Sequence, residues 1–128
     1  MFLEHVNLTT SDLERSIAFY TALFGWTVRW RGEATGEEST VPAAHVGDDR
    51  CYVAIFESEN AGRAPFDYER SGLNHMGFVV DDLEATRARA LALGATIHFE
   101  PDYAPGRRFY VCDPDGIELE LVAYDTAT

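Results

Sequence analysis

The N-terminal part of the chain changes from an alternating pattern of residues to a helical one. Over Phe2–Thr9, apolar and polar residues alternate, which predicts a strand with an apolar face and an opposite face that carries His5. Ser11–Glu14 then has the form of a capping box, which predicts a helix beginning at this point. Apolar residues then recur at helical spacing, at Leu13, Ile17, Tyr20 and Phe24. Gly25 follows and is predicted to end the helix.

Three further strands are predicted after this helix. They cover Trp26–Trp30, Ser39–Val46 and Cys51–Glu57, where residues that favour strands are frequent. The polar, glycine-containing stretch Arg31–Glu38 predicts a hairpin loop between the first two. Residues 58–72 are polar and contain proline and glycine, which indicates a connector between two halves of the chain.

The second half of the chain repeats the first. Leu73–Glu84 can be laid on Leu3–Glu14 by a shift of 70 positions (73 − 3), and the shift superimposes His75 on His5. A helix capped by Asp81 and ending before Gly94 is predicted next. Strands are then predicted over Ala95–Phe99, Arg108–Cys112 and Ile117–Ala123, with a turn at Pro101–Gly106.

These elements predict an α+β fold of two tandem βαβββ modules. Module one spans residues 1–57, the connector spans 58–72 and module two spans 73–124, all within a single domain over 1–128. The face of each sheet that lies opposite its helix must also be covered. We therefore expect a pair of curved mixed sheets around a central cavity, with the helices outside.

The last predicted strand carries two carboxylates on one face. Alternation places Glu118 and Glu120 together, opposite the leucines, on the side of the sheet that would also carry His5 and His75. An ionised carboxylate that is buried there needs a partner. Two imidazoles and one carboxylate suit a divalent transition metal, so the sequence predicts a site for Fe, Mn, Zn, Ni or Co.

Composition narrows the possible partners. The formal net charge of −12 argues against nucleic acid, and no apolar run is long enough to span a membrane. The N-terminus does not have the pattern of a signal peptide, which favours a cytoplasmic protein with Cys51 and Cys112 reduced. The basic pair Arg107–Arg108 is suited to one anionic group of a small ligand, or is simply a surface pair.

Several motifs together resemble the vicinal oxygen chelate superfamily, the glyoxalase, bleomycin-resistance and extradiol-dioxygenase group. They are His5 followed by S-D-L-E-R-S and F-Y-x-x-L-F-G-W, the strand G-L-N-H-M-G-F-V-V-D-D-L, and F-Y-V-C-D-P-D-G-I-E-L-E-L. The resemblance implies that His5, His75 and Glu120 are metal ligands. It also implies a small-molecule substrate and a homodimer.

One departure from that family bears on the reaction. Glyoxalase I-like members carry a fourth ligand, usually Glu or Gln, on the last strand of module one, where Ala54 stands in this chain. An alanine has no donor atom, so the sequence predicts a three-ligand site and argues against glyoxalase I activity. The resemblance leaves dioxygenase, lyase and isomerase chemistry open.

The remaining candidates have alternative interpretations. Glu118 and Tyr110 are candidate proton shuttles, although Glu118 also suits a role behind a ligand histidine and Tyr110 suits the core. His45 and His98 are interpreted as structural. Residues expected to line a substrate cavity are Asn7, Tyr52, Ala54 and Arg108.

The leading hypothesis is a metal-dependent enzyme that binds adjacent oxygens of a small molecule. The alternatives are a metal-free protein of the bleomycin-resistance type that binds a drug, and a sensor or inactive homologue.

Overall fold

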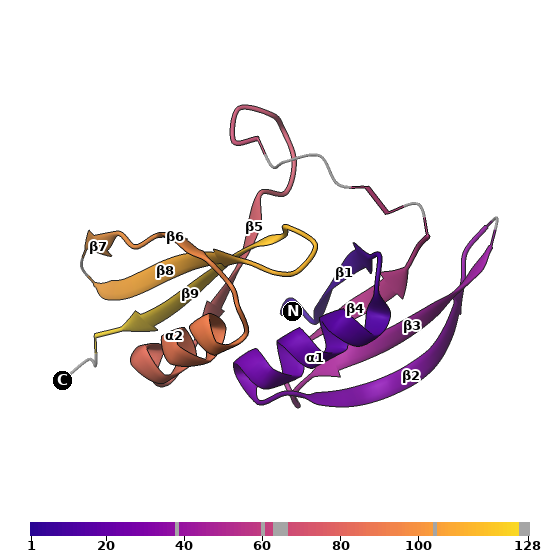
Figure 1. Ribbon diagram of the computed structural model, residues 1–128, viewed down its shortest axis with the longest axis horizontal. Helices are drawn as coiled ribbons and strands as arrows, with labels where there is room; N and C mark the ends of the chain where they lie inside the picture. The colour runs from indigo at the N-terminus through magenta and orange to yellow at the C-terminus, as the bar shows by residue number, and fades with distance from the viewer. Residues whose placement is uncertain (38, 60, 63–66, 104, 126–128) are drawn as a thin grey trace. The chain divides into compact units, whose positions relative to one another are not determined.

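The chain forms two compact units, Met1–Arg63 and Ala64–Thr128 (Figure 1). This computed structural model describes residues 1–37, 39–59, 61–62, 67–103 and 105–125. The boundary between the units falls inside the predicted connector 58–72, of which residues 60 and 63–66 lie outside the described residues. The single domain over 1–128 stays a prediction.

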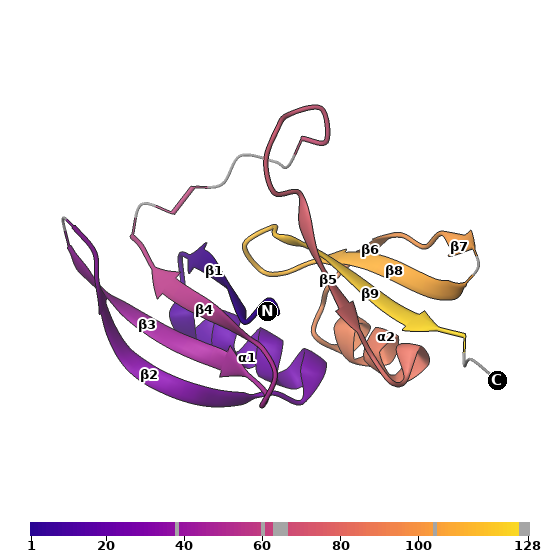
Figure 2. The same cartoon turned by 180° about the vertical axis from the view of Figure 1, so that it is seen from behind.

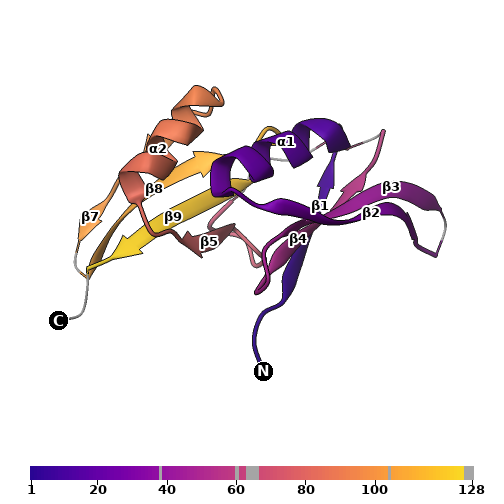
Figure 3. The same ribbon diagram turned by 90° about the horizontal axis from the view of Figure 1, so that it is seen from below.

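The first unit is a four-stranded mixed sheet with one helix. Its elements are β1 (His5–Thr10), α1 (Leu13–Phe24), β2 (Thr27–Thr35), β3 (Thr40–Gly47) and β4 (Tyr52–Glu57). The sheet order is β1-β4-β3-β2, in which β1 is parallel to β4 and the other pairs are antiparallel. Figure 3 shows α1 lying along one face of this sheet.

The second unit repeats this plan. Its elements are β5 (His75–Val79), α2 (Leu83–Ala92), β6 (Ile97–Phe99), β7 (Asp102–Tyr103), β8 (Gly106–Cys112) and β9 (Glu118–Tyr124). The sheet order is β5-β9-β8-β6, and β7 pairs with β8. Strand β5 runs parallel to β9, as Figure 2 shows. The predicted βαβββ modules of an α+β fold are thus confirmed.

Alternate strand residues form the core between each sheet and its helix. In the first unit, strand residues such as Leu8, Val53 and Ile55 are buried together with residues of α1. In the second unit the same alternation buries Leu119 and Leu121. The opposite face of each sheet therefore carries the polar candidates. The largest side chains with almost no exposure include Tyr20, Phe109, Leu23, Ile55, Leu119 and Leu121.

The predicted helix caps are each wrong by one residue. Asp12 rather than Ser11 caps α1, because its carboxylate accepts a hydrogen bond from the backbone N–H of Arg15 at 3.1 Å. Asp82 rather than Asp81 caps α2, because its carboxylate accepts from the N–H of Ala85 at 3.0 Å. Both caps are the aspartates that the 70-residue repeat superimposes.

The predicted hairpin loop Arg31–Glu38 is also wrong over most of its length. Strand β2 continues to Thr35, and its last five residues pair with β3 as far as the Thr35–Thr40 pair. Strand β2 lies at the edge of the sheet with most of its residues exposed, so polar side chains do not interrupt it. The predicted turn Pro101–Gly106 contains the short strand β7.

Two smaller observations concern the predicted partners. In the part of the chain that the structure describes, no helix is long and apolar enough to cross a membrane. Within the described residues, neither Cys51 nor Cys112 forms a disulfide.

Candidate metal and substrate site

The second unit brings His75 and Glu120 into direct contact. His75 begins β5 and Glu120 lies on the parallel neighbour β9, on the face opposite its leucines. The Nε2 atom of His75 is 3.0 Å from Oε1 of Glu120. The structure therefore places two of the three predicted metal ligands side by side.

Glu120 is held from two further directions. Tyr110 donates its hydroxyl to Oε1 at 2.9 Å, and Arg108 donates Nη1 to Oε2 at 2.8 Å. Burial alone would raise the pKa of Glu120, but the hydrogen bonds of Tyr110, His75 and Arg108 together lower it below its ordinary value. Glu120 is thus an ionised carboxylate in a fixed orientation.

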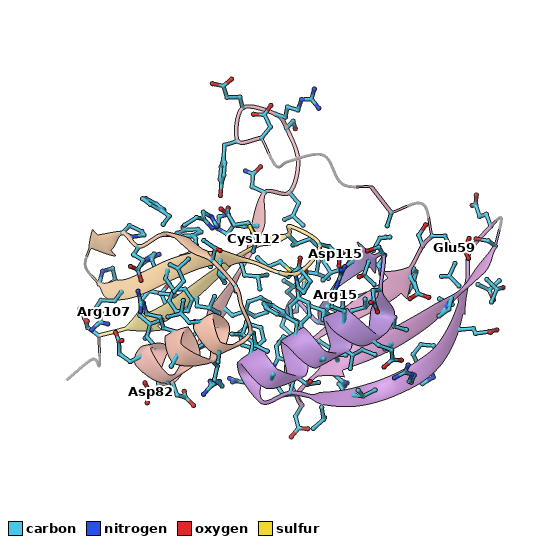
Figure 4. The ribbon with its side chains drawn as sticks, viewed as in Figure 1. Arg15, Glu59, Asp82, Arg107, Cys112 and Asp115 are labelled. Carbon is cyan, nitrogen blue, oxygen red and sulfur yellow. The ribbon has the colours of Figure 1, made fainter. Side chains whose placement is uncertain are left out.

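The basic pair predicted to receive an anionic group binds carboxylates of this chain. Arg107 contacts Glu84 of α2 and lies on β8, where Figure 4 labels it. Arg108, whose side chain is 10% exposed, contacts Glu120 instead. Of the pair, Arg108 alone touches a predicted site residue.

Glu118 is the most deeply buried carboxylate of the candidate site, with 3% of its surface exposed. The hydroxyl of Tyr68 donates to its Oε1, and Nε2 of His98 is 2.7 Å from its Oε2. The Nδ1 atom of His75 lies 3.6 Å from Oε1 of Glu118 and 3.2 Å from the Tyr68 hydroxyl. Glu118 therefore stands behind His75, on the side away from Glu120.

Sequence reasoning missed two members of this cluster, Tyr68 and His98. Tyr68 comes from the connector, where no periodicity points to a site. His98 is interpreted from the sequence as structural, and in the structure its Nε2 atom lies 2.7 Å from Oε2 of Glu118. Its signal is a β-bulge between Ile97 and Phe99, an irregularity that redirects a side chain and that alternation alone does not reveal.

The first unit surrounds His5 with its own contacts. Its Nδ1 atom is 2.8 Å from Oε1 of Glu4, and its ring stacks on Tyr52 with 4.9 Å between ring centroids. The Tyr52 hydroxyl also donates to Oε1 of Glu4 at 3.2 Å. The hydrogen bonds from His5 and Tyr52 lower the pKa of Glu4, whereas burial and then Glu4 raise the pKa of Tyr52.

The predicted cavity residues of this unit share the face that carries His5. Asn7 pairs with Ala54 across β1 and β4, and its side-chain amide donates to the Ala54 carbonyl at 2.9 Å. Tyr52 is the partner of His5 in the same ladder. The fourth, Arg108, belongs to the second unit, and the cavity itself stays a prediction.

The strand ladders show which positions of the two units are equivalent. His5 pairs with Tyr52 as His75 pairs with Glu118. Two residues further along β4 and β9 stand Ala54 and Glu120, which pair with His45 and Tyr110. Ala54 is thus the counterpart of Glu120, as the sequence alignment predicts, and the first unit has no carboxylate there.

The bulge is duplicated as well. A register shift lies between Val28 and Trp30 in β2, just as one lies between Ile97 and Phe99 in β6. The bulged residues are Arg29, whose guanidinium lies 4.6 Å from the Tyr52 ring centroid, and His98. The side chain of Arg29 thus contacts Tyr52, which pairs with His5. The side chain of His98 contacts Glu118, which pairs with His75.

The second unit supplies two candidate donor atoms for a metal ion, Nε2 of His75 and Oε1 of Glu120. Across the described residues, no group of three or more His, Cys, Asp or Glu side chains is arranged to hold one. Two donors bound at about 2.1 Å and at a right angle are about 3.0 Å apart, which is the separation of His75 Nε2 and Glu120 Oε1. The pair therefore fits two adjacent ligand positions.

A comparison of the sequence with protein families decides the classification. The sequence profile of the glyoxalase/bleomycin resistance protein/dioxygenase superfamily matches residues 2–121. The chain belongs to this superfamily. A member of similar length, named a probable lactoylglutathione lyase of Vibrio cholerae, is 32% identical over 122 residues, which cover 92% of this chain and 87% of that protein.

Solved structures of superfamily members show the same fold. The glyoxylase/bleomycin resistance protein/dioxygenase domain from Frankia sp. EAN1pec has a TM-score of 0.82 and 28% identity, over 100% of this chain and 95% of that one. The fosfomycin resistance protein FosX from Listeria monocytogenes has a TM-score of 0.74 and 21% identity, over 94% and 90% of the two chains. The latter was solved with Mn(II) and 1S,2S-dihydroxypropylphosphonic acid.

Proposed function

We propose that this protein is a metal-dependent enzyme that acts on a small molecule with two adjacent oxygens, and that His75 and Glu120 bind the metal ion. The observation that carries this proposal is the 3.0 Å contact between His75 Nε2 and Glu120 Oε1. The Mn(II) in the FosX structure supports the choice of a divalent transition metal, among Fe, Mn, Zn, Ni and Co. The third predicted ligand, His5, belongs to the other unit, and the His5→Ala variant described below tests whether it binds the metal ion.

The contact between the side chains of His75 and Glu120 is a hydrogen bond in which Nε2–H of His75 is the donor, because an ionised carboxylate can only accept. A divalent ion that binds both atoms would take the place of this proton.

A bound divalent ion would act as a Lewis acid on the substrate oxygens. The chain's own residues hold and orient the site. Arg108 and Tyr110 fix the carboxylate of Glu120, and Glu118 stands behind His75. The hydroxyl of Tyr110 and the carboxylate of Glu118 are our candidates for moving a substrate proton.

The reaction class is proposed as dioxygenase, lyase or isomerase chemistry at a three-ligand site. Ala54 occupies the counterpart of Glu120, so the first unit cannot supply the fourth ligand expected of a glyoxalase I-like site. Although one relative is named a probable lactoylglutathione lyase, we expect this chain not to convert the hemithioacetal of methylglyoxal and glutathione at an appreciable rate.

Elemental analysis of protein purified without chelators tests the proposal. We expect about one transition-metal ion per chain in the wild type, and a large loss in His75→Ala, Glu120→Gln and His5→Ala. His45→Gln is the matched control, because His45 contacts aromatic rings rather than a carboxylate. A wild type that takes up none of these metals even after supplementation contradicts the proposal.

One observation favours a second candidate function, the metal-free binding of an aromatic drug. A row of rings crosses the first sheet, with centroid distances of 4.9 Å from His5 to Tyr52, 4.5 Å from Tyr52 to His45 and 4.9 Å from His45 to Trp30. Burial, and then the charge of His5, lowers the pKa of His45, which favours its neutral form. Such a row suits stacking of a planar ligand.

A thermal-shift screen separates the two functions. Divalent metals should raise the melting temperature if the protein is the proposed enzyme, whereas aromatic cations should raise it if the protein is a drug-binding protein. A Trp30→Ala variant should lose only the second kind of shift.

A further inference from the structure

We infer that Phe99 selects the substrate of this site, by contacting an apolar, ring-sized group that the substrate carries next to its two oxygens. This inference rests on the proposed function and adds to it the chemical class of the substrate. It assigns a task to an exposed aromatic side chain that is neither a proposed ligand nor a proposed proton carrier.

The side chain of Phe99 lies on the face of the second sheet that carries Glu120. Phe99 pairs with Tyr110 across β6 and β8, and directly paired residues project from the same face of a sheet. The centroids of these two rings are 5.5 Å apart. Tyr110 donates its hydroxyl to Glu120, and its ring centroid is 5.3 Å from that of His75. Tyr110 therefore connects Phe99 to both proposed ligands.

The β-bulge of β6 brings two consecutive residues to this face. In a regular strand, His98 and Phe99 would point to opposite faces. The register shift lies between Ile97 and Phe99, and the rings of His98 and Phe99 are both near that of Tyr110, at 6.4 Å and 5.5 Å. Bulges redirect side chains in this way and are frequent beside active sites. The bulge thus places a polar ring against Glu118 and an apolar ring next to it.

The first unit has an aromatic residue at the equivalent position. Trp30 follows the bulge of β2 as Phe99 follows that of β6. It pairs with His45, the residue that the strand ladders make the counterpart of Tyr110. The ring centroids of Trp30 and His45 are 4.9 Å apart. Both copies of the repeat therefore present an aromatic ring directly after the bulge.

Neither ring is covered by the core between its sheet and helix. The exposed fraction is 57% for Phe99 and 42% for Trp30. A ligand that covers apolar surface is stabilised in proportion to the area removed from water, and a planar group also gains from the geometry of ring pairs. A substrate whose two oxygens reach a metal ion at His75 and Glu120 has its remaining atoms over this face. Its apolar group then covers Phe99.

Two hydroxamates that differ only beside their oxygens test the inference. Acetohydroxamate and benzohydroxamate bind a metal ion through the same pair of adjacent oxygens, and they carry a methyl and a phenyl group. Titration of the Co(II)-loaded full chain with each probe, followed by the Co(II) absorption spectrum, gives the ratio of their dissociation constants. We expect this ratio to favour benzohydroxamate in the wild type, and the preference to fall about tenfold in Phe99→Ala.

Three further variants show whether the ring itself is responsible. Phe99→Trp should keep the preference, since tryptophan stands at the equivalent position of the first unit. Phe99→Leu, which keeps an apolar side chain in place of the ring, should show an intermediate preference. Leu91→Ala is the matched control, because it removes an apolar side chain of α2 that is 49% exposed, and it should behave as the wild type does. The affinity for Co(II) should be the same in all of these chains.

The same preference in the wild type, Phe99→Ala and Phe99→Leu would overturn the inference while leaving the proposed function in place. A Phe99→Ala chain with half the wild-type mass in light scattering would also overturn it, since the ring would then belong to an interface between two copies of the chain. A wild type that binds no Co(II), or whose Co(II) spectrum responds to neither hydroxamate, would overturn the proposed function and the inference with it.

Discussion

Gly47 lies at a point of the first unit where no side chain fits. A Cβ atom there would be 2.1 Å from the carbonyl oxygen of Cys51 and 2.5 Å from Cα of Tyr52, which are backbone atoms that cannot turn aside. We expect Gly47→Ala to lower the free energy of unfolding by about 1–3 kcal/mol, as overpacking does. Urea denaturation measures this, with Gly62→Ala as the control, because a Cβ there meets no atom within 4 Å. Equal stability of the two variants would contradict the account.

Asp48 gives the neighbouring turn a defined pH dependence. Its carboxylate accepts from the backbone N–H groups of Arg50 at 2.8 Å and Cys51 at 3.0 Å, and the hydrogen bond from Cys51, then that from Arg50, lowers its pKa. A lowered pKa stabilises the folded state above the unfolded-state pKa of about 4, and this stabilisation is lost as the pH falls through the folded-state value.

The expected result is that the melting temperature of Asp48→Asn is below that of the wild type at pH 7, and that the difference shrinks below about pH 4. Thermal unfolding monitored by circular dichroism at a series of pH values measures it. Asp49→Asn is the neighbouring control, and a difference for Asp48→Asn that stays constant with pH would show that the carboxylate charge is not involved.

At the scale of single residues, the sequence predicts those site residues whose positions follow from strand alternation or from the repeat. Alternation along the last strand places Glu120 on the face away from the leucines, and the repeat identifies His75 as its partner. Tyr68 could not be found in this way, because a connector has no period. His98 was missed because a bulge reverses the face on which a residue is expected.

The start of α2 supplies a prediction at the scale of an element. The carboxylate of Asp82 satisfies the N–H of Ala85, which lacks a partner within the helix. We expect Asp82→Ala to lower the free energy of unfolding by about 1 kcal/mol, and Asp81→Ala, at the position favoured by the sequence, to change it much less. Chemical denaturation compares the two, and a larger effect of Asp81→Ala would refute the assignment of the cap.

The elements themselves follow closely from the sequence, but their ends do not. Gly25 takes a positive φ of 68° and ends α1 as predicted, because glycine adopts this conformation without steric cost. Strand β2 is longer than its apolar pattern, since backbone pairing with β3 extends over the exposed polar residues up to Thr35. Hydrogen bonds between strands are a long-range property that a local pattern cannot report.

At the scale of the whole molecule, the two units share a plan but differ in chemistry. Equivalent ladders place Ala54 opposite His45 in one unit and Glu120 opposite Tyr110 in the other. The repeat thus duplicates the histidine, but not the carboxylate of Glu120. This asymmetry is what the proposal of a three-ligand site depends on.

The predicted homodimer also belongs to this scale. The mass of one chain is 14.3 kDa. We expect light scattering coupled to size exclusion to give twice this mass at micromolar concentration. The mass of a single chain over that range would contradict the prediction.

The central claim is that His75 and Glu120 bind a divalent metal ion, and calorimetric titration of the chelator-stripped chain with Mn(II) tests it most directly. The account predicts saturable binding of about one ion per chain in the wild type, and binding lost or weakened at least a hundredfold in Glu120→Gln. No binding of Mn(II), Fe(II), Co(II), Ni(II) or Zn(II) by the wild type, or unchanged binding in Glu120→Gln, would contradict it.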